Sequence, residues 1–384
     1  MEDVVFPDYS NSTLNVIATI LKHFNVPSSY DSVKVVEEAL NKGYKNVLFM
    51  IFDGMGKDVL EHNLKADDFL LRHMIHEVTS VYPSTTTAAM TSYYTVLSPN
   101  EHGWLGWFLY FKEYGRCIDT FLDKDSYTGE KIKAESAAHR LMPYETIFDI
   151  IEKQNDKQVT CHMINPKGIK IPGNHPQNNV KSTIDMCQFI AQICEEDGSK
   201  FIFTYWDEPD NTMHGTGCYS KETNKNINSI NQQIESLSKQ LHDTLIIISA
   251  DHGLIDIEST IYINEIPQID ELLIMPPHIE ARGASFYVKS NRTADFKEQF
   301  LKRFEDDFML LTKEEVYKNN ILGFGKSHKK TDDFIGDYLA IAIGNKQIKY
   351  HTATSKEKRE HKASHAGMHR NEMVVPVIMF DTTK

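Results

Sequence analysis

The sequence predicts an α/β protein with a largely parallel central sheet flanked by helices and with a smaller α+β cap insertion. Short apolar runs rich in β-branched and aromatic residues alternate with amphipathic segments, which is typical of βα units around a parallel sheet. The 384 residues, 41 % of them hydrophobic and 25 % charged, are enough to bury a large core. We expect strands at Asn46–Phe52, Val159–Ile164, Lys200–Tyr205, Thr244–Ser249 and Met373–Phe380.

An edge strand and two helices are expected among these elements. Pro376 lies within the last apolar run and favours the edge of the sheet, because proline has no N–H to donate to a neighbouring strand. Thr183–Glu195 is predicted to be helical. A longer helix carries apolar residues spaced three and four apart: Ile227, Ile230, Ile234, Leu237 and Leu241. We expect this stripe to face the core, although it would also suit a dimer, so the oligomeric state stays open.

The pattern of predicted strands and helices changes after about residue 260. Within this stretch we expect two strands, Gly283–Lys289 and Asp337–Gly344, and a charged helix, Ala294–Asp307. The predicted division is an α/β core formed by residues 1–258 and 361–384 and an α+β insertion formed by residues 259–360. Because the insertion separates two segments rich in Asp and His, we expect it to lie over the site that they form and to shape the choice of substrate.

Composition and charge argue against several classes of protein. The net charge of −13 disfavours binding of a nucleic-acid duplex, which depends on clustered Lys and Arg. No run approaches the roughly 20 apolar residues of a membrane-spanning helix, so no membrane partner is expected. The five cysteines form no CxxC pair, and the N-terminus carries Glu2, Asp3 and Asp8 where a secretory signal would be basic and then apolar. Cytoplasmic residence is therefore the expectation.

Five segments at or beside the expected strands carry side chains suited to chemistry. In the first, Asp53 ends a buried strand pattern and is followed by Gly54 and Gly56, which permit a tight turn. Ligands of open α/β sheets bind outside the carboxyl ends of the strands, where Asp53 would lie. An Asp that caps the next helix would explain the same pattern.

The second segment has four consecutive hydroxyl residues, Ser84 to Thr87, leading into an expected helix. A hydroxyl at a helix N-terminus faces free backbone N–H groups and the positive end of the helix dipole, which suits the binding of a phosphate. One of the four is a candidate nucleophile. N-capping by Ser84 or Thr85 is the alternative explanation.

The third segment follows another apolar strand. Asp210 and His214 are four residues apart, so on a helical turn both project from one face and can share a metal ion. Asp207 and Glu208 compete for the same role. A hydrogen-bonded pair at the surface would have the same spacing.

The fourth and fifth segments add a carboxylate and imidazoles. Asp251 and His252 end a very apolar strand pattern, and Gly253 permits the sharp turn that lets neighbours ligate one ion. His365 and His369 precede the last strand. Hydrogen bonds to nearby backbone, or a solvated loop, would explain these residues without a metal.

Together the five segments supply three Asp, three His and a hydroxyl. Such a set suits two zinc-like ions of mixed nitrogen and oxygen ligation. Two ions a few ångströms apart can activate an attacking oxygen and stabilise a leaving one, as in-line phosphoryl transfer requires. The sequence therefore predicts a soluble two-metal hydrolase of phosphate esters. A metal-containing binding protein without turnover is the alternative from a different class.

The ordered motifs resemble the alkaline phosphatase superfamily, and most closely its nucleotide pyrophosphatase/phosphodiesterase branch. The resemblance covers most of the chain and is carried by Asp53-Gly, Tyr82-Pro-Ser-Thr-Thr86, Thr95-Val-Leu-Ser-Pro-Asn-Glu-His102-Gly, Pro209-Asp210-Asn-Thr-Met-His214, Asp251-His252-Gly and His365-Ala-Gly. A series of motifs in the family's order is far more specific than any one of them.

The resemblance implies an alkaline phosphatase-like fold and two divalent ions, zinc first and manganese as the alternative. One ion would be held by Asp53, Asp251, His252 and the Thr86 oxygen, and the other by Asp210, His214 and His365. Thr86, three residues after Pro83 and nine before Thr95, is implied as the nucleophile that forms a phosphothreonine, which water then hydrolyses. The expected substrate is a small molecule with a phosphodiester or pyrophosphate bond.

Two departures from the family bear on the substrate. The family has an aromatic residue directly after the nucleophile and an Asn that contacts the phosphoryl group, where this chain has Thr87 and Trp107. Trp107 is therefore a candidate substrate-binding residue, in a cluster that would either line a pocket or pack in the core: Trp104, Trp107, Phe108, Tyr110 and Phe111. A phosphomonoesterase is the nearest alternative, although it would usually supply an Arg for the second phosphate charge, and none of the arginines near these segments is compelling.

Overall fold

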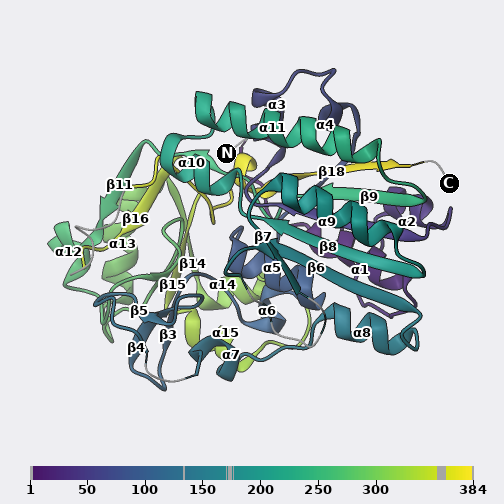
Figure 1. Cartoon of the computed structure of the whole chain (residues 1–384). Helices are drawn as coiled ribbons and strands as arrows, with labels where there is room; N and C mark the ends of the chain where they lie inside the picture. Colours follow the sequence, from purple (N-terminus) through teal and green to yellow (C-terminus); the bar gives the residue numbers. More distant parts are fainter. Residues whose placement is uncertain are drawn as a thin grey trace.

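The computed structural model in Figure 1 describes residues 3–132, 135–169, 171, 175, 177–352 and 360–382. A seven-stranded sheet forms the body of the molecule, in the order β2-β18-β9-β1-β8-β6-β7. Its strands are β1 (Asn46–Phe52), β2 (Met74–Thr79), β6 (Val159–Pro166), β7 (Gln177–Val180), β8 (Ser199–Trp206), β9 (Thr244–Ser249) and β18 (Val374–Asp381). The pairs from β7 to β9 are parallel, whereas β18 is antiparallel to both neighbours. The predicted α/β class is therefore confirmed.

Helices cover both faces of this sheet (Figure 1). One group of helices that pack together consists of α1 (Thr13–His23), α2 (Lys34–Leu40), α5 (Thr86–Thr95) and α8 (Ile147–Gln154). The other group consists of α3 (Lys57–Asn63), α4 (Phe69–Arg72), α9 (Thr183–Glu195) and α11 (Lys221–Ser238). Shorter helices are α6 (Pro99–His102), α7 (Ala137–Leu141), α10 (Asp210–Thr216) and α16 (Arg370–Met373).

The five predicted strands of the main sheet are confirmed. The predicted bounds agree with β1 and β9 and differ by one or two residues in the other three. Every residue of β1 and β9 is buried, because helices cover both faces, and this burial explains their unbroken apolar sequences. The predicted helix Thr183–Glu195 is α9, and the apolar stripe of α11 is buried within the chain.

The predicted edge position of Pro376 is wrong. β18 lies between β2 and β9, so β2 forms the edge of the sheet instead. Pro376 is tolerated because pairing of β18 with β9 begins only at Ile378, and the Pro376 carbonyl accepts a hydrogen bond from Ser249 Oγ at 2.8 Å. The error arose because β2 contains His76 and Glu77 among its apolar residues and gave no clear strand signal.

A second sheet has the order β14-β15-β13-β12-β3-β4-β5. Its strands are β3 (Phe108–Phe111), β4 (Arg116–Asp119), β5 (Lys124–Asp125), β12 (His278–Ile279), β13 (Gly283–Phe286), β14 (Phe308–Thr312) and β15 (Tyr338–Ala342). β13, β15 and α13 (Thr293–Phe304) correspond to the elements predicted for the insertion. β12 pairs with β3, so this sheet also contains residues 108–125, which precede the insertion. The division of the chain into domains stays a prediction.

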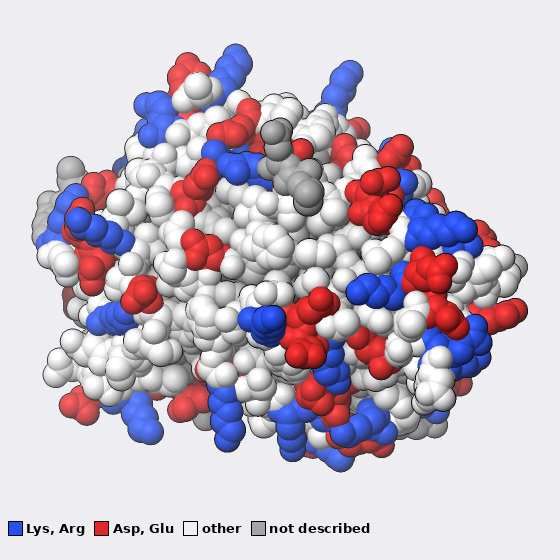
Figure 2. All heavy atoms as spheres, turned by 180° about the vertical axis from the view of Figure 1, so that it is seen from behind, with Lys and Arg blue, Asp and Glu red and all other residues white. Residues whose placement is uncertain are grey.

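The remaining described elements are short. They are η1 (Ile263–Glu265), α12 (Pro267–Asp270), α14 (Lys313–Lys318), α15 (Lys329–Phe334) and the two-stranded pairs β10 (Ile255–Asp256) with β17 (Ala363–Ser364) and β11 (Ser259–Tyr262) with β16 (Lys346–Lys349). Among the described helices, none is long and apolar enough to cross a membrane. Figure 2 shows acidic and basic side chains interspersed on one face, where the described residues form no broad basic area.

A buried ion pair joins the second sheet to the main one. Arg282 follows β12, and Glu372 belongs to α16, which leads into β18; both side chains are fully buried. Nε and Nη2 of Arg282 each donate to the Glu372 carboxylate at 2.7 Å. The guanidinium also donates to the carbonyls of Gly344 and Lys346, at 2.7 and 2.6 Å. Such a bidentate pair is strong only while both partners are present.

Replacing Glu372 by Ala is expected to lower the free energy of unfolding by about 3–5 kcal/mol, because the Arg282 charge would stay buried without its partner. Urea denaturation followed by circular dichroism measures this loss. The exposed pair Lys34–Glu38 provides the control, since Glu38→Ala should cost less than about 0.5 kcal/mol. A loss below about 1 kcal/mol for Glu372→Ala would show that the pair does little to join the two sheets.

Candidate metal centre

The carboxyl ends of β1, β8 and β9 meet at one edge of the main sheet, and backbone hydrogen bonds hold the following residues together. The Asp53 N–H donates to the Trp206 carbonyl at 2.9 Å, and the Asp210 N–H donates to the Asp53 carbonyl at 3.1 Å. The Gly54 N–H donates to Oδ1 of Asp251 at 3.1 Å. Gly54 has a φ of +69°, and a Cβ there would clash with Leu254 at 2.5 Å, so the turn requires glycine.

One cluster at this edge contains Asp53, Asp251 and His252, whose candidate ligand atoms all lie within 4.8 Å of one another. Nε2 of His252 lies 3.4 Å from Oδ1 of Asp53 and 3.3 Å from Oδ2 of Asp251. Oγ1 of Thr86 lies 3.4 Å from Oδ2 of Asp53 and 3.3 Å from Nε2 of His252. The structure thus brings together the four residues implied for the first ion.

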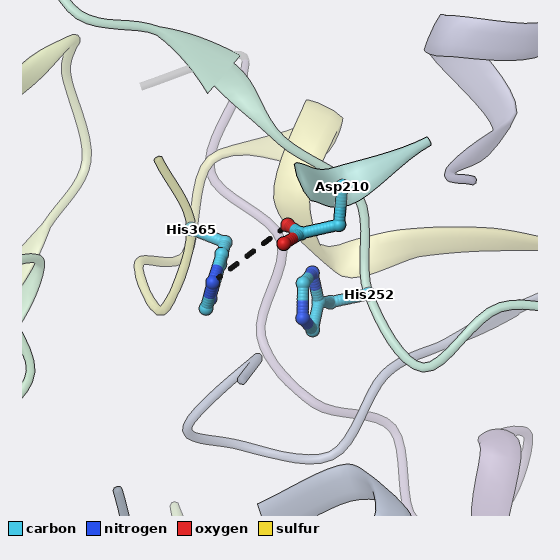
Figure 3. A group of neighbouring side chains, drawn as sticks. All are labelled: Asp210, His252 and His365. Carbon is cyan, nitrogen blue, oxygen red and sulfur yellow. Dashed lines mark ion pairs between the residues drawn. The ribbon is translucent and has the colours of Figure 1, made fainter. Parts of the chain in front are cut away.

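A second cluster contains Asp210, His252 and His365, with ligand atoms again within 4.8 Å (Figure 3). Nε2 of His365 lies 3.9 Å from Oδ1 of Asp210, and the His252 and His365 rings stack at 4.0 Å. His214 lies beside this cluster, with its Nε2 3.2 Å from Oδ2 of Asp210. All three residues implied for the second ion therefore gather here, and His252 lies between the two clusters.

The three histidines share one arrangement. Nδ1 of each lies near a backbone carbonyl: Ala363 for His214 at 2.8 Å, Gly253 for His252 at 3.1 Å and Ser84 for His365 at 3.2 Å. A carbonyl only accepts, so Nδ1 of each ring carries a proton, and Nε2 is the ring nitrogen that lies toward the carboxylates. Metal-ligating histidines are fixed in this way by a hydrogen bond from their other ring nitrogen.

The carboxylates also fit a cation. Oδ1 of Asp53, Oδ1 of Asp210 and Oδ2 of Asp251 are buried and make no hydrogen bond. Burial, followed by the charges of Asp251 and Asp210, raises the pKa of Asp53 well above its usual value. Burial likewise raises the pKa of Asp251. For Asp210 burial also acts to raise the pKa, but His214, His365 and His252 together outweigh it, so the pKa is lowered. Carboxylates buried so close together repel one another unless positive charge lies among them.

Thr86 is the first residue of α5, and Thr85 occupies the N-cap position. The Thr85 hydroxyl does not cap the helix, because its Oγ1 donates to Oε1 of Glu280 at 2.9 Å. Ser84 donates to the Gly367 carbonyl at 2.9 Å, and the Thr87 side chain is fully buried. Of the four consecutive hydroxyls, only that of Thr86 contacts the first cluster in the hydrogen bonds described here.

The other candidates lie outside both clusters. Glu208 accepts a hydrogen bond from the Thr212 N–H at 3.0 Å, and His369 caps α16 through the Asn371 N–H at 3.2 Å. His102 is buried, accepts the Trp104 N–H at 2.9 Å and contacts Ser92 Oγ at 3.1 Å. Asp207 belongs to neither group of ligand atoms.

The aromatic cluster is divided between core and surface. Trp104 and Phe111 are buried in the core. Trp107 is half-buried, and its ring meets Phe121, 45 % exposed, edge to face at 4.9 Å. An apolar surface therefore lies beside Trp107, and its backbone N–H donates to Oε1 of Glu280 at 2.8 Å.

Sequence reasoning missed two residues of the site. Glu280 contacts Thr85, and the hydroxyl of Tyr205 donates a short hydrogen bond to Oδ2 of Asp53. Tyr205 ends the apolar run before Asp210, so its place on a strand beside β1 is a signal that was available. Glu280 has no such local signal.

The fold and the clusters define a protein of the alkaline phosphatase superfamily, as the motifs indicated. The family model described as type I phosphodiesterase / nucleotide pyrophosphatase matches residues 47–369. The chain therefore belongs to this family. A curated relative from Caenorhabditis elegans, ectonucleotide pyrophosphatase/phosphodiesterase C27A7.3, is 23 % identical over 244 residues, which are 59 % of this chain and 31 % of the relative. The chain thus spans less than a third of that relative's length.

Solved structures show the same fold. Murine ectonucleotide pyrophosphatase/phosphodiesterase 5 has a TM-score of 0.63 at 17 % identity, covering 86 % of this chain and 87 % of that one. Phosphonoacetate hydrolase from Sinorhizobium meliloti 1021, in complex with phosphonoformate, has a TM-score of 0.61 at 16 % identity, covering 87 % and 89 %. At these identities the likeness concerns the fold alone.

Loading the metal-free protein with zinc is expected to raise its melting temperature by at least about 5 °C, because bound cations would relieve the repulsion among the buried carboxylates. Differential scanning fluorimetry measures the shift, and elemental analysis should find about two ions per chain. His365→Ala should bind about one ion, whereas His351→Ala, on the exposed surface, should bind the full number. An unchanged melting temperature with no retained zinc would contradict the assignment of the clusters as metal sites.

Proposed function

We propose that the chain is a metal-dependent hydrolase of phosphate esters that cleaves phosphodiester or pyrophosphate bonds through a phosphothreonine intermediate. The observation that carries the proposal is the position of Thr86 Oγ1, 3.4 Å from Asp53 and 3.3 Å from His252. A hydroxyl at the first residue of a helix, beside a cluster of metal-type ligands, is placed for nucleophilic attack on a phosphate. Membership of the phosphodiesterase family supports the same reaction.

Two ions of mixed nitrogen and oxygen ligation fit the residues present. The first would be held by Asp53, Asp251, His252 and the Thr86 oxygen, and the second by Asp210, His214 and His365. Zinc suits these ligands best, and manganese is the second candidate. When bound, such ions supply Lewis acidity, which favours an ionised hydroxyl and offsets charge on the phosphoryl and leaving oxygens.

Thr86 would then act in two displacements. Its Oγ1 gives up its proton to solvent water and forms a bond to phosphorus, while the bond from phosphorus to the leaving oxygen breaks and that oxygen departs with the electron pair and takes a proton from water. Water attacks the phosphothreonine in the second step, and Thr86 leaves with the electron pair of its bond and regains a proton. Free N–H groups at the start of α5 face the same position and can bind phosphoryl oxygens.

The residue after the nucleophile is Thr87 and not an aromatic residue, so the leaving group would stack on aromatic side chains elsewhere. Thr87 is fully buried and offers no stacking surface. The rings of Trp107 and the exposed Phe121 meet at 4.9 Å, and the Trp107 N–H donates to Glu280, which contacts the residue before the nucleophile. Murine ectonucleotide pyrophosphatase/phosphodiesterase 5 has been solved with AMP, so an aromatic or base-containing group is a reasonable occupant. A small-molecule phosphate ester is the proposed substrate, and cytoplasmic residence stays a prediction.

A phosphomonoesterase is a weaker candidate. It would use an extra cation to balance the second charge of its substrate, and Arg282 is committed to Glu372 and to backbone carbonyls. Arg116 pairs with Asp125 at 3.5 Å on the second sheet. Neither guanidinium is in the clusters.

Thr86→Ala is expected to lower turnover of a diester by at least about 10³-fold while leaving the metal content nearly intact, because the nucleophile is lost but Asp53, Asp251 and His252 remain to hold the first ion. Hydrolysis of bis-p-nitrophenyl phosphate and elemental analysis measure the two effects. Thr86→Ser should retain part of the activity, and Thr95→Ala, on the same helix, should retain most of it. Full activity in Thr86→Ala would exclude this nucleophile.

Trp107→Ala is expected to raise the KM for a dinucleotide about fivefold or more, with a smaller effect on kcat, because base stacking contributes roughly 1–3 kcal/mol. Steady-state kinetics on a diadenosine polyphosphate test this. Methyl p-nitrophenyl phosphate serves as a comparison substrate that has no base to stack on Trp107. Phe324→Ala removes an exposed aromatic that packs on Tyr9 and is the matched control. An equal loss of kcat/KM for both substrates would argue against a stacking role of Trp107.

A further inference from the structure

Glu280 brings a carboxylate from the insertion to the edge of the metal centre. It directly follows β12, the short strand that pairs with β3. The residue belongs to neither group of candidate ligand atoms. It is also the only contact of the insertion with the hydroxyl segment before α5 among the hydrogen bonds described for the chain.

Two hydrogen bonds fix the carboxylate. Oγ1 of Thr85 donates to Oε1 at 2.9 Å, and the Trp107 N–H donates to the same oxygen at 2.8 Å. Thr85 directly precedes Thr86, so the carboxylate is hydrogen-bonded to the neighbour in sequence of the candidate nucleophile. Trp107 is one of the two aromatic residues proposed to bind the leaving group. The same carboxylate oxygen therefore links one of these residues to the residue before the nucleophile.

The carboxylate also faces the second cluster. Glu280 and His214 interact electrostatically, each shifting the ionisation of the other. Burial raises the pKa of Glu280 to about 7, against the lowering effect of the Trp107 N–H, Thr85 and His214. Above pH 8 the group is therefore charged. The carboxylate is thus hydrogen-bonded to Thr85 and Trp107 and interacts electrostatically with His214, one of the proposed metal ligands.

We propose that Glu280 determines substrate specificity by placing a negative charge beside the phosphoryl position, so that the site favours phosphodiesters over phosphomonoesters. This inference rests on the proposed function. A diester phosphate carries one negative charge, whereas a monoester at this pH carries nearly two. The extra charge of the monoester would be repelled by Glu280, while the single charge of the diester can be directed toward the metal ions that the two clusters would hold and away from Glu280.

The test compares two esters with one leaving group, p-nitrophenyl phosphate and methyl p-nitrophenyl phosphate, on the zinc-loaded protein at pH 8.5. Glu280→Gln keeps an oxygen that can accept from Thr85 and Trp107 but removes the charge. We expect kcat/KM for the monoester to rise about tenfold and that for the diester to change less than about twofold. Inhibition by inorganic phosphate should strengthen by a similar factor, a readout that needs no turnover of the monoester.

Two further variants separate charge from structure. Glu280→Asp keeps the charge but disturbs both hydrogen bonds, so it should keep the unaltered ratio of monoester to diester cleavage. Glu152→Gln is the matched control, because Glu152 is a half-buried acceptor of the Cys161 N–H, at 2.9 Å, away from the clusters. This inference alone would be overturned if Glu280→Gln left the ratio of monoester to diester kcat/KM unchanged. It would also be overturned if Glu280→Asp raised that ratio as much as Glu280→Gln does. An unaltered protein that cleaves neither ester would overturn the proposed function and this inference with it.

Discussion

Three buried carboxylates, those of Asp53, Asp210 and Asp251, share one edge of the main sheet, and their mutual repulsion is the constraint around which the site is built. The backbone holds them there: Asp53 bonds to Trp206 at the end of β8 and to Asp210, and the Gly54 N–H binds the side chain of Asp251. Burying these carboxylates together is unfavourable without positive charge among them. The simplest explanation of the arrangement is therefore that the residues are ligands of cations.

The second sheet contributes to this edge through the ion pair of Arg282 and Glu372. Oε1 of Glu372 accepts the Gly367 N–H at 2.7 Å, the Gly367 carbonyl accepts from Ser84, and the Ser84 carbonyl accepts from Nδ1 of His365. The loop that carries His365 is thereby tied both to the segment before the nucleophile and to the buried pair. Glu280 and Arg282 both belong to the predicted insertion, residues 259–360, so this segment contributes the ion pair with Glu372 and the carboxylate beside Thr85.

The predictable parts of the molecule are those with a local signal. Strands buried on both faces are unbroken apolar runs, and candidate ligands next to them follow from the Asp and His at their ends. Strands β2 and β7 carry polar residues and gave no such signal, and overlooking β2 led to the error about Pro376. Glu280 reaches the site only because β12 pairs with β3, a contact between residues far apart in sequence. Spacing alone did not separate Thr86 from Thr85 as a nucleophile; the resemblance did, and tertiary contacts now distinguish their hydroxyls.

The most direct test of the two-metal centre is a titration of the metal-free protein with zinc, in which the hydrolysis of bis-p-nitrophenyl phosphate is followed as each equivalent is added. A two-metal hydrolase predicts no cleavage without metal and a rate that reaches its plateau at about two ions per chain. Full activity in the metal-free protein, or no cleavage of this diester or of p-nitrophenyl phosphate at any zinc concentration, would contradict it.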